Sequence, residues 1–287
     1  MLVSMNETDL DYDAVVIGGG PAGLQAALTL GRVHRRTLLL DDGHYRNDPA
    51  THMHNFIGHD GTPPAELRAA ARKDLAAYDS VSTRDDRAMT VSVDVPGFRV
   101  GLGEDAVTAR GLVLATGMRD TLPDIPGIAD LFGDIVAHCP FCHGHEFAGA
   151  PVAVLGPAID HLGAIMAPVA SSVTGHAVED VARVERAGDG VRVVLTDGSA
   201  HEYAGVFVST QLSQAAPFAE QLGLALLPSG GVEVDAFQRT SVPGVFAAGD
   251  MAHTAVLPMP LASVVTAAAA GMVAGSALVQ HLLTTPL

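Results

Sequence analysis

The chain has 287 residues, of which 48% are hydrophobic and 17% charged, a composition typical of globular rather than disordered proteins. Its formal net charge of −16, without a basic patch, excludes a nucleic-acid-binding protein. The first residues contain neither a basic segment nor a long apolar run, so we expect no signal peptide.

Hydrophobic periodicity and turn residues predict strands and helices that alternate along the chain. Up to Gly117 the predicted elements are a strand over 14–17, a helix over 24–32, a strand over 37–40, a helix over 63–78, a hairpin over 90–95 and 98–103, and a strand over 107–114. Later elements are a strand over 151–155, a helix over 159–169, a hairpin over 191–195 and 202–208, a strand over 245–248 and a helix over 261–282. This order predicts an α/β fold with a parallel sheet.

The uncharged segment 255–283 is long enough to cross a membrane. However, Pro258 and Pro260 interrupt its start, and Ala and Gly rather than Leu and Ile dominate its composition. We therefore expect a buried helix inside a packed domain and no association with a membrane.

A glycine-rich turn follows the first predicted strand and opens the first predicted helix. Gly18, Gly20 and Gly23 have the G-x-G-x-x-G spacing that lets a backbone approach a pyrophosphate at a helix N-terminus. Asp41 ends the next strand, where a carboxylate can bind a ribose hydroxyl. The turn therefore predicts a dinucleotide site, but by itself it does not distinguish FAD from NAD.

The two cysteines of the chain, Cys139 and Cys142, lie three positions apart. A secreted disulfide scaffold would use more cysteines at wider spacing, so we interpret the pair as a redox-active disulfide in a cytoplasmic protein. A position at the start of a helix would lower the pKa of a cysteine thiol and favour disulfide exchange. Zinc needs more ligands than the pair and its neighbouring histidines offer, so we expect no metal.

Two later segments, Ala109–Gly117 and Gly244–Asp250, resemble the second and third flavin-binding stretches of flavoproteins with two dinucleotide-binding domains. With the cysteine pair, they make the chain similar to low-molecular-weight thioredoxin reductases. The resemblance is closer to dithiol oxidases of the gliotoxin and holomycin type. Those share the Cys-x-x-Cys-His run ending at His143, a stretch like Leu40–Asn47 and the His-Met-His run at 52–54.

The resemblance implies an α/β protein with a Rossmann-like FAD-binding domain in three layers. A smaller, shortened second α/β domain would carry the cysteines. We place the FAD-binding domain at 1–118 and 207–287, and the small domain, similar to an NADPH-binding domain, at 119–206. We also expect a homodimer, as the resemblance implies.

The same resemblance assigns roles to individual residues. Cys142 would exchange electrons with the flavin, Cys139 would react with substrate, and His143 would act as the base. The implied FAD site comprises Gly18, Gly20, Gly23, Asp41, Arg46, Asn47, Thr116, Gly117, Gly249 and Asp250.

The chain departs from thioredoxin reductases at the second nucleotide-binding motif. Only Gly156 and Gly163 remain there, and Pro157 and Asp160 occupy the phosphate turn. An aspartate repels a pyrophosphate, and the paired arginines that would bind a 2′-phosphate are absent. We therefore expect FAD but not NADPH as a cofactor, with a divergent NADPH site as the alternative.

Without NADPH, the flavin would be reduced by thiols and reoxidised by oxygen. The leading hypothesis is an FAD-dependent dithiol oxidase that converts a small-molecule dithiol to an intramolecular disulfide and forms hydrogen peroxide. Its setting would be the biosynthesis of a disulfide natural product, or self-protection against one. Two alternatives stay open: a disulfide reductase supplied by ferredoxin or a divergent NAD(P)H site, and a non-enzymatic flavin redox sensor.

Overall fold

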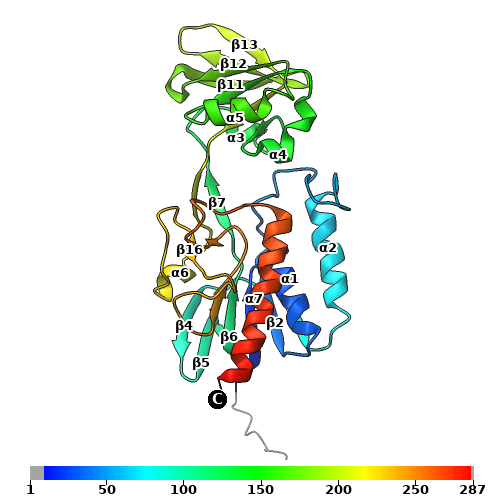
Figure 1. The fold of residues 1–287 in the computed structure, drawn as a ribbon, viewed down its shortest axis with the longest axis vertical. Coiled ribbons are helices and arrows are strands. Elements are labelled where there is room, and N and C mark those ends of the chain that lie inside the picture. Colours follow the sequence, from blue (N-terminus) through cyan, green and yellow to red (C-terminus); the bar gives the residue numbers. More distant parts are fainter. Residues whose placement is uncertain (1–9, 286–287) are drawn as a thin grey trace, which may run out of the picture. The chain divides into compact units, whose positions relative to one another are not determined.

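The structure, a computed structural model, describes residues 10–285 and divides the chain into two units (Figure 1). Unit 1 comprises the chain up to Tyr45, Leu67–Arg119 and the chain from Ser213 onward. Unit 2 comprises Arg46–Glu66 and Asp120–Leu212. The predicted small domain, 119–206, covers most of unit 2, but unit 2 also contains 46–66.

A seven-stranded sheet forms the core of unit 1, in the order β3-β2-β1-β6-β5-β4, with β17 also paired to β6. The strands are β1 (Tyr12–Ile17), β2 (Thr37–Asp41), β3 (Val81–Asp85), β4 (Thr90–Asp94), β5 (Gly97–Leu102), β6 (Asp105–Leu114) and β17 (Val245–Ala247). The parallel strands share one register, in which Leu40, Ile17, Leu114 and Ala247 lie in a single row. The residues that follow these strands therefore meet at one edge of the sheet.

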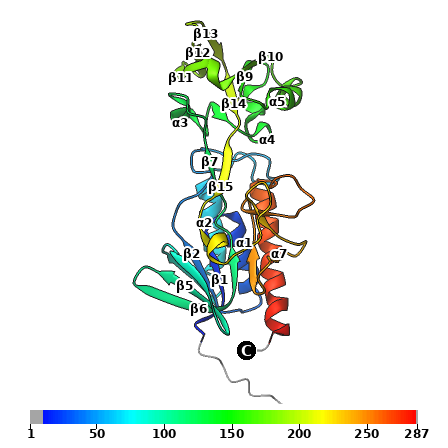
Figure 2. The same cartoon turned by 90° about the vertical axis from the view of Figure 1, so that its left-hand side faces the viewer.

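Two long helices of unit 1, α1 (Pro21–Gly31) and α7 (Val264–Thr284), lie side by side in both views (Figures 1 and 2). Small residues allow this contact: a Cβ on Gly271 would overlap the carbonyl oxygen of Ala22. Among the described residues, α7 is the one helix long and apolar enough to cross a membrane, and 33% of its most apolar window is buried. Its buried face packs on α1, as its Ala and Gly content predicts.

The other elements of unit 1 are short, apart from α2. They are α2 (Pro64–Leu75), which begins in unit 2, α6 (Phe218–Gln221), and the paired strands β16 (Val232–Glu233) and β18 (Ala252–His253). The predicted hairpin over 90–103 is confirmed by the antiparallel pairing of β4 with β5. The edge strand β3 was not predicted, because its side chains are mostly exposed and show no apolar alternation.

Unit 2 contains two sheets. A parallel sheet has the order β10-β9-β14-β8, and an antiparallel sheet has the order β11-β12-β13. Their strands are β8 (Val136–Ala137), β9 (Pro151–Leu155), β10 (Ser172–His176), β11 (Val181–Ala187), β12 (Gly190–Leu195), β13 (Ala200–Tyr203) and β14 (Gly205–Val208). The helices are α3 (Ile128–Leu131), α4 (Pro140–His143), η1 (His145–Phe147), α5 (Ile159–Met166) and η2 (Val178–Asp180). The chain crosses between the units after Tyr45, within α2, and within two paired strands, β7 (Met118–Thr121) and β15 (Gln211–Gln214).

The predicted single strand over 202–208 is wrong, because the chain changes sheets at Ala204. β13 pairs antiparallel with β12, whereas β14 pairs parallel with β9. Gly205, the first residue of β14, packs against the ring of Phe147, which leaves no room for a Cβ. A continuous apolar run cannot reveal such a change of partner.

Candidate active site and cofactor site

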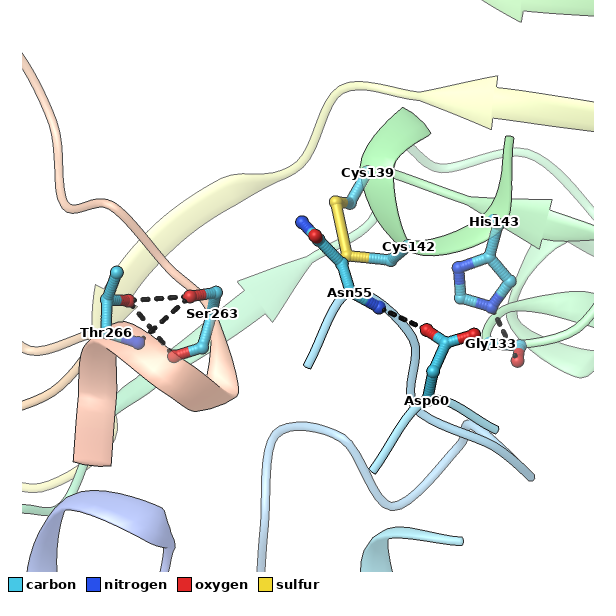
Figure 3. The surroundings of a disulfide bond; sticks show 8 residues. All are labelled: Asn55, Asp60, Gly133, Cys139, Cys142, His143, Ser263 and Thr266. Carbon is cyan, nitrogen blue, oxygen red and sulfur yellow. Dashed lines mark hydrogen bonds between the residues drawn. A yellow bond between two sulfur atoms is a disulfide. The ribbon is translucent and has the colours of Figure 1, made fainter. Parts of the chain in front are cut away.

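Cys139 and Cys142 form a disulfide in unit 2, with their Cα atoms 5.3 Å apart (Figure 3). Cys139 is the N-cap residue of α4, which begins at Pro140. The backbone N–H groups of Cys142 and His143 both donate to the carbonyl of Cys139, at 3.2 Å each. This single turn brings the two sulfurs together, so the pair can be reduced and reformed with little movement of the backbone.

The imidazole of His143 follows the second cysteine directly. Its Nε2 lies 3.3 Å from the carbonyl oxygen of Gly133 and hydrogen-bonds to it (Figure 3). Its Nδ1 is buried and has no hydrogen-bond partner among the described residues. The predicted base therefore has one nitrogen held by the backbone and one nitrogen that is unpaired.

Aromatic side chains lie within the cysteine turn and directly before it. Phe141, between the two cysteines, is 66% exposed and offers an apolar surface beside the disulfide. His138 stacks on Phe132, with ring centroids 5.8 Å apart. Among the described residues, no group of three or more His, Cys, Asp or Glu is arranged to hold a metal ion.

Residues 46–66 contribute a histidine–carboxylate cluster to unit 2. The Nδ1 of His54 lies 3.5 Å from Asp60, and its Nε2 lies 3.5 Å from Glu146. The backbone N–H of Asn55 donates to Asp60 at 2.7 Å. This hydrogen bond, together with His54, lowers the pKa of Asp60. The His-Met-His run entered the sequence analysis only as part of the resemblance, and the cluster was missed because Glu146 lies far along the chain from His54 and Asp60.

The first glycine turn in unit 1 fits a dinucleotide. Gly18 has a φ of +113°, and a Cβ there would overlap the carbonyl of Ala115. A Cβ on Gly23 would overlap the carbonyl of Gly18. In contrast, a Cβ on Gly20 would meet no atom within 4 Å, so open space lies against the backbone at the N-terminus of α1. A pyrophosphate needs this combination of a tight turn, an accessible backbone and a helix N-terminus.

The other predicted FAD residues of unit 1 follow the parallel strands at the same edge of the sheet. Asp41 ends β2, Thr116 and Gly117 follow β6, and Gly249 and Asp250 follow β17. Gly117 and Gly249 have positive φ values of 70° and 80°. The carboxyl ends of parallel strands are where open α/β sheets bind ligands. The structure thus brings these residues to the edge where FAD would bind, and their individual contacts with FAD remain predictions.

Asp41 is held by neighbours that the sequence did not indicate. The hydroxyl of Tyr45 donates to it at 2.6 Å, the backbone N–H of Gly43 donates at 3.0 Å, and Arg72 forms an ion pair with it. Burial, together with the hydrogen bond to Asp41, raises the pKa of Tyr45 to about 12. Arg68 lies over the ring of Tyr45, with its guanidinium carbon 3.8 Å from the centroid. These contacts orient the carboxylate that would bind the ribose of FAD.

Arg46 and Asn47 belong to unit 2, unlike the other residues of the predicted FAD site. The guanidinium of Arg46 donates to both oxygens of Asp120, at 2.6 and 2.8 Å, and Thr210 donates to the same carboxylate. Burial opposes ionisation of Asp120, but the hydrogen bonds from Arg46 and Thr210 outweigh it and lower the pKa of this carboxyl. Arg46 thus has a structural partner, and its contact with FAD stays a prediction, as does that of Asn47.

The second strand–turn–helix unit, β9 to α5, lacks features that a dinucleotide needs. Gly156 keeps a positive φ of 98°, but Pro157 has no N–H to offer a phosphate. Asp160 lies in the first turn of α5, and Glu179 and Asp180 follow β10. Carboxylates at these positions would repel a phosphate bound at this turn.

Known proteins resemble this chain over most of its length. Residues 12–158 and 169–271 match the family described as pyridine nucleotide-disulphide oxidoreductase. Thioredoxin reductase sirT of Leptosphaeria maculans is 33% identical over 313 residues, which cover 92% of each chain. Thioredoxin reductase aclD of Aspergillus oryzae is 34% identical and covers 83% of this chain and 88% of its own. An oxidoreductase from Agrobacterium tumefaciens has a similar crystal structure, with a TM-score of 0.86 at 31% identity, covering 96% of this chain and 99% of its own.

These similarities confirm the predicted fold class, a Rossmann-like α/β protein of the thioredoxin reductase type. They also confirm the predicted resemblance and the assignment as an oxidoreductase. The family implies FAD as the cofactor, and the first glycine turn fits it. The chain belongs to the pyridine nucleotide-disulphide oxidoreductase family and is a thioredoxin-reductase-like FAD disulfide oxidoreductase.

Proposed function

We propose that this enzyme oxidises a small-molecule dithiol to an intramolecular disulfide, with oxygen as the electron acceptor and hydrogen peroxide as the second product. The observation that carries the proposal is the charge of unit 2, where the NADPH of a thioredoxin reductase would bind. We further propose that the enzyme is a cytoplasmic homodimer that acts in the biosynthesis of, or protection against, a disulfide natural product.

Unit 2 is strongly acidic, and each of its arginines is paired with a carboxylate. It contains four arginines, no lysine and fifteen Asp and Glu residues. The arginines form the ion pairs Arg46–Asp120, Arg183–Glu185, Arg186–Asp134 and Arg192–Glu202. NADPH carries a pyrophosphate and a 2′-phosphate, which proteins bind with cations and helix N-termini. This charge distribution favours electron entry from substrate thiols rather than from NADPH.

The cysteine turn supports a compact organic substrate. Phe141 is largely exposed beside the disulfide and offers an apolar contact for a small molecule. No charged residue lies between His138 and His145 in the sequence, so the turn itself favours an uncharged dithiol.

The residues of unit 2 carry the thiol chemistry. A substrate thiol gives its proton to His143, and the resulting thiolate attacks the sulfur of Cys139. The Cys139–Cys142 bond breaks, and its electron pair leaves on Cys142 as a thiolate. The second substrate thiolate then attacks the substrate sulfur of the mixed disulfide and releases Cys139. Two electrons and two protons have then passed from the substrate to the enzyme.

Gly18, Gly20, Gly23, Asp41, Thr116, Gly117, Gly249 and Asp250 would hold FAD at the edge of the unit 1 sheet. When bound, FAD supplies the two-electron redox chemistry that restores the disulfide and delivers the electrons to oxygen.

An anaerobic titration of the flavin-loaded enzyme tests the proposal. We expect excess NADPH to leave the flavin absorbance unchanged and a small dithiol such as dithiothreitol to bleach it. In air, the dithiol should cause oxygen consumption with one hydrogen peroxide per disulfide. Cys142→Ser is the control: a dithiol should neither bleach its flavin nor cause oxygen consumption. Rapid anaerobic bleaching by NADPH would overturn the proposal.

A second candidate is a disulfide reductase that acts on thioredoxin or a similar protein. The names of the relatives, thioredoxin reductases sirT and aclD, favour it. This function needs an electron donor other than a dithiol, such as reduced ferredoxin. Reduction of a thioredoxin disulfide by the enzyme with reduced ferredoxin, and no oxygen consumption with dithiols, would establish it over the first candidate.

A further inference from the structure

We propose that the backbone carbonyl of Gly133 holds His143 in the tautomer with its proton on Nε2 and thereby makes Nδ1 the proton acceptor of the cysteine site. The inference rests on the proposed dithiol oxidation, in which His143 is the base. It deepens that function by naming the reacting atom and a positioning residue, Gly133.

The direction of one hydrogen bond fixes the tautomer. The Nε2 of His143 and the carbonyl oxygen of Gly133 are 3.3 Å apart. A carbonyl oxygen can only accept, so Nε2 must carry the proton. In a neutral imidazole the other nitrogen then carries the lone pair, which places it on Nδ1.

The unpaired state of Nδ1 needs a physical explanation. This atom is buried and has no partner among the described residues, a state that costs free energy in a protein interior. In the oxidised enzyme, which has no thiolate nearby, protonation of Nδ1 would leave a buried donor unpaired and would add an uncompensated positive charge, which costs more free energy than an unpaired acceptor. The oxidised disulfide has no S–H group to donate. A substrate thiol, or a reduced cysteine, has one and would satisfy the lone pair.

The orientation of the ring agrees with this role. Figure 3 shows Nε2 of His143 turned toward Gly133, and the opposite side of the ring, with Nδ1, turned toward the cysteine pair. His143 is also the residue directly after Cys142 in α4, so its ring moves with the cysteine turn. A proton taken at Nδ1 is therefore held beside the sulfur that leaves as a thiolate, and the imidazolium stabilises that charge.

The carbonyl of Gly133 is itself held in place by its surroundings. Gly133 has a φ of +93°, and its N–H donates to the carbonyl of Val136 at 2.8 Å. A Cβ on Gly133 would lie 2.5 Å from the Cβ of Pro49 and 2.6 Å from its carbonyl carbon. Only glycine fits this site without a shift of the backbone. The segment 46–66 thus contributes to the orientation of the base through Pro49.

Nitrogen-15 NMR of the flavin-loaded enzyme tests the tautomer directly. With histidine labelled at both ring nitrogens, long-range proton–nitrogen correlations show which nitrogen carries the proton, and His143→Gln identifies the signals of His143. We expect a protonated Nε2 and an unprotonated Nδ1 in the oxidised enzyme. Protonation of Nδ1 in the neutral ring would overturn the inference. This readout needs no substrate, so it is separate from failure of the proposed function, which would appear as inactivity with every dithiol.

A pair of glycine variants tests the positioning role. Gly133→Ala should shift the carbonyl and lower the anaerobic rate of disulfide reduction by a dithiol by about 100-fold, the usual contribution of a general base. The dependence of that rate on pH should lose the limb that reports His143, while the flavin content stays normal.

Gly149→Ala is the matched control, because Gly149 also has a positive φ, of 73°, but a Cβ there meets no atom within 4 Å. It should keep the wild-type rate and pH dependence, so backbone strain by itself does not explain the loss. A normal rate and pH profile in Gly133→Ala would overturn the positioning role. If Gly133→Ala does not fold, the NMR measurement on the wild-type enzyme decides.

Discussion

The chain contains the same local design twice, with different chemistry. In unit 1 the strand β1 leads through Gly18–Gly23 into α1, and in unit 2 the strand β9 leads through Gly156–Asp160 into α5. Both turns begin with a glycine at positive φ after a buried strand. The first turn has the glycines Gly20 and Gly23 and no acidic residue in the first turn of its helix, whereas the second turn has Asp160 at that place. The fold of such a unit depends on its buried strands, and the ligand depends on the few residues of the turn.

The largest expected effect is a change in the first turn. Gly23→Ala would place a Cβ on the carbonyl of Gly18, and overpacking of this kind costs about 1–3 kcal/mol. Because the displaced backbone forms the phosphate turn, we expect the FAD affinity to fall by about 10- to 100-fold. Flavin absorbance after purification and a fluorescence titration of the apoprotein with FAD measure the loss. Normal FAD affinity in Gly23→Ala would show that the close packing of the first turn is not needed for cofactor binding.

A second test concerns Arg46, a predicted FAD residue that forms an ion pair with Asp120 inside unit 2. Asp120→Asn should lower the free energy of unfolding by roughly 2–3 kcal/mol at pH 7, because it removes the carboxylate that forms an ion pair with the partly buried Arg46. Chemical denaturation of the flavin-loaded enzyme measures this difference.

The pH dependence of that difference has a defined sign. The pKa of Asp120 is lower in the folded protein than its ordinary value of 3.8. The carboxylate therefore stabilises the fold fully above that ordinary value, and the stabilisation disappears as the pH falls through the lower, folded-state pKa. The gap between wild type and Asp120→Asn should accordingly be constant from pH 7 to about pH 5 and shrink below about pH 4. A gap that widens in acid would contradict the ion pair.

A third, smaller effect is expected at the ribose position. Asp41→Asn keeps the shape of the side chain but removes the charge that binds Arg72 and would bind a ribose hydroxyl. We expect the FAD affinity to fall about tenfold, the equivalent of one charge-assisted hydrogen bond. Asp160→Asn, the change at the acidic residue of the second turn, should leave the FAD affinity unaltered. Equal effects of the two variants would remove the distinction between the turns.

The smallest effect is expected in α5, for which we propose that the ligand function is absent. A Cβ on Gly163 would make only ordinary contacts, at 3.8 Å from Val173 and 4.0 Å from Ile159. Gly163→Ala should therefore raise the free energy of unfolding by about 0.5–1 kcal/mol, as alanine does inside a helix. Thermal unfolding measures the gain. If Gly163→Ala destabilised the protein and also abolished a stabilisation of the wild type by added NADPH in thermal unfolding, the second turn would have kept a ligand.

Local patterns predicted much of the fold, and long-range pairing explains the failures. The strand–turn–helix around Gly18 and the turn around Cys139 follow from residue spacing within one segment. The strand over 202–208 was predicted as one piece. Its sequence does not encode that the chain pairs with β12 up to Tyr203 and with β9 from Gly205 onward. Residues 46–66 were expected in the FAD-binding domain, because chain order does not encode the contact of Pro49 with Gly133.

The sequence by itself determined the chemistry that depends on neighbours along the chain: a cysteine pair that closes one turn, a histidine directly after it and a glycine turn with the dinucleotide spacing. The tertiary structure decided what surrounds these groups. It placed the carbonyl of Gly133 on His143, Tyr45 and Arg72 on Asp41, and a carboxylate on each arginine of unit 2. The contact of Gly133 with His143 joins residues 10 positions apart, and the pairs Arg72–Asp41 and Arg46–Asp120 join residues 31 and 74 positions apart. Residue spacing therefore predicts that a base is present, while packing decides which of its nitrogens can accept a proton.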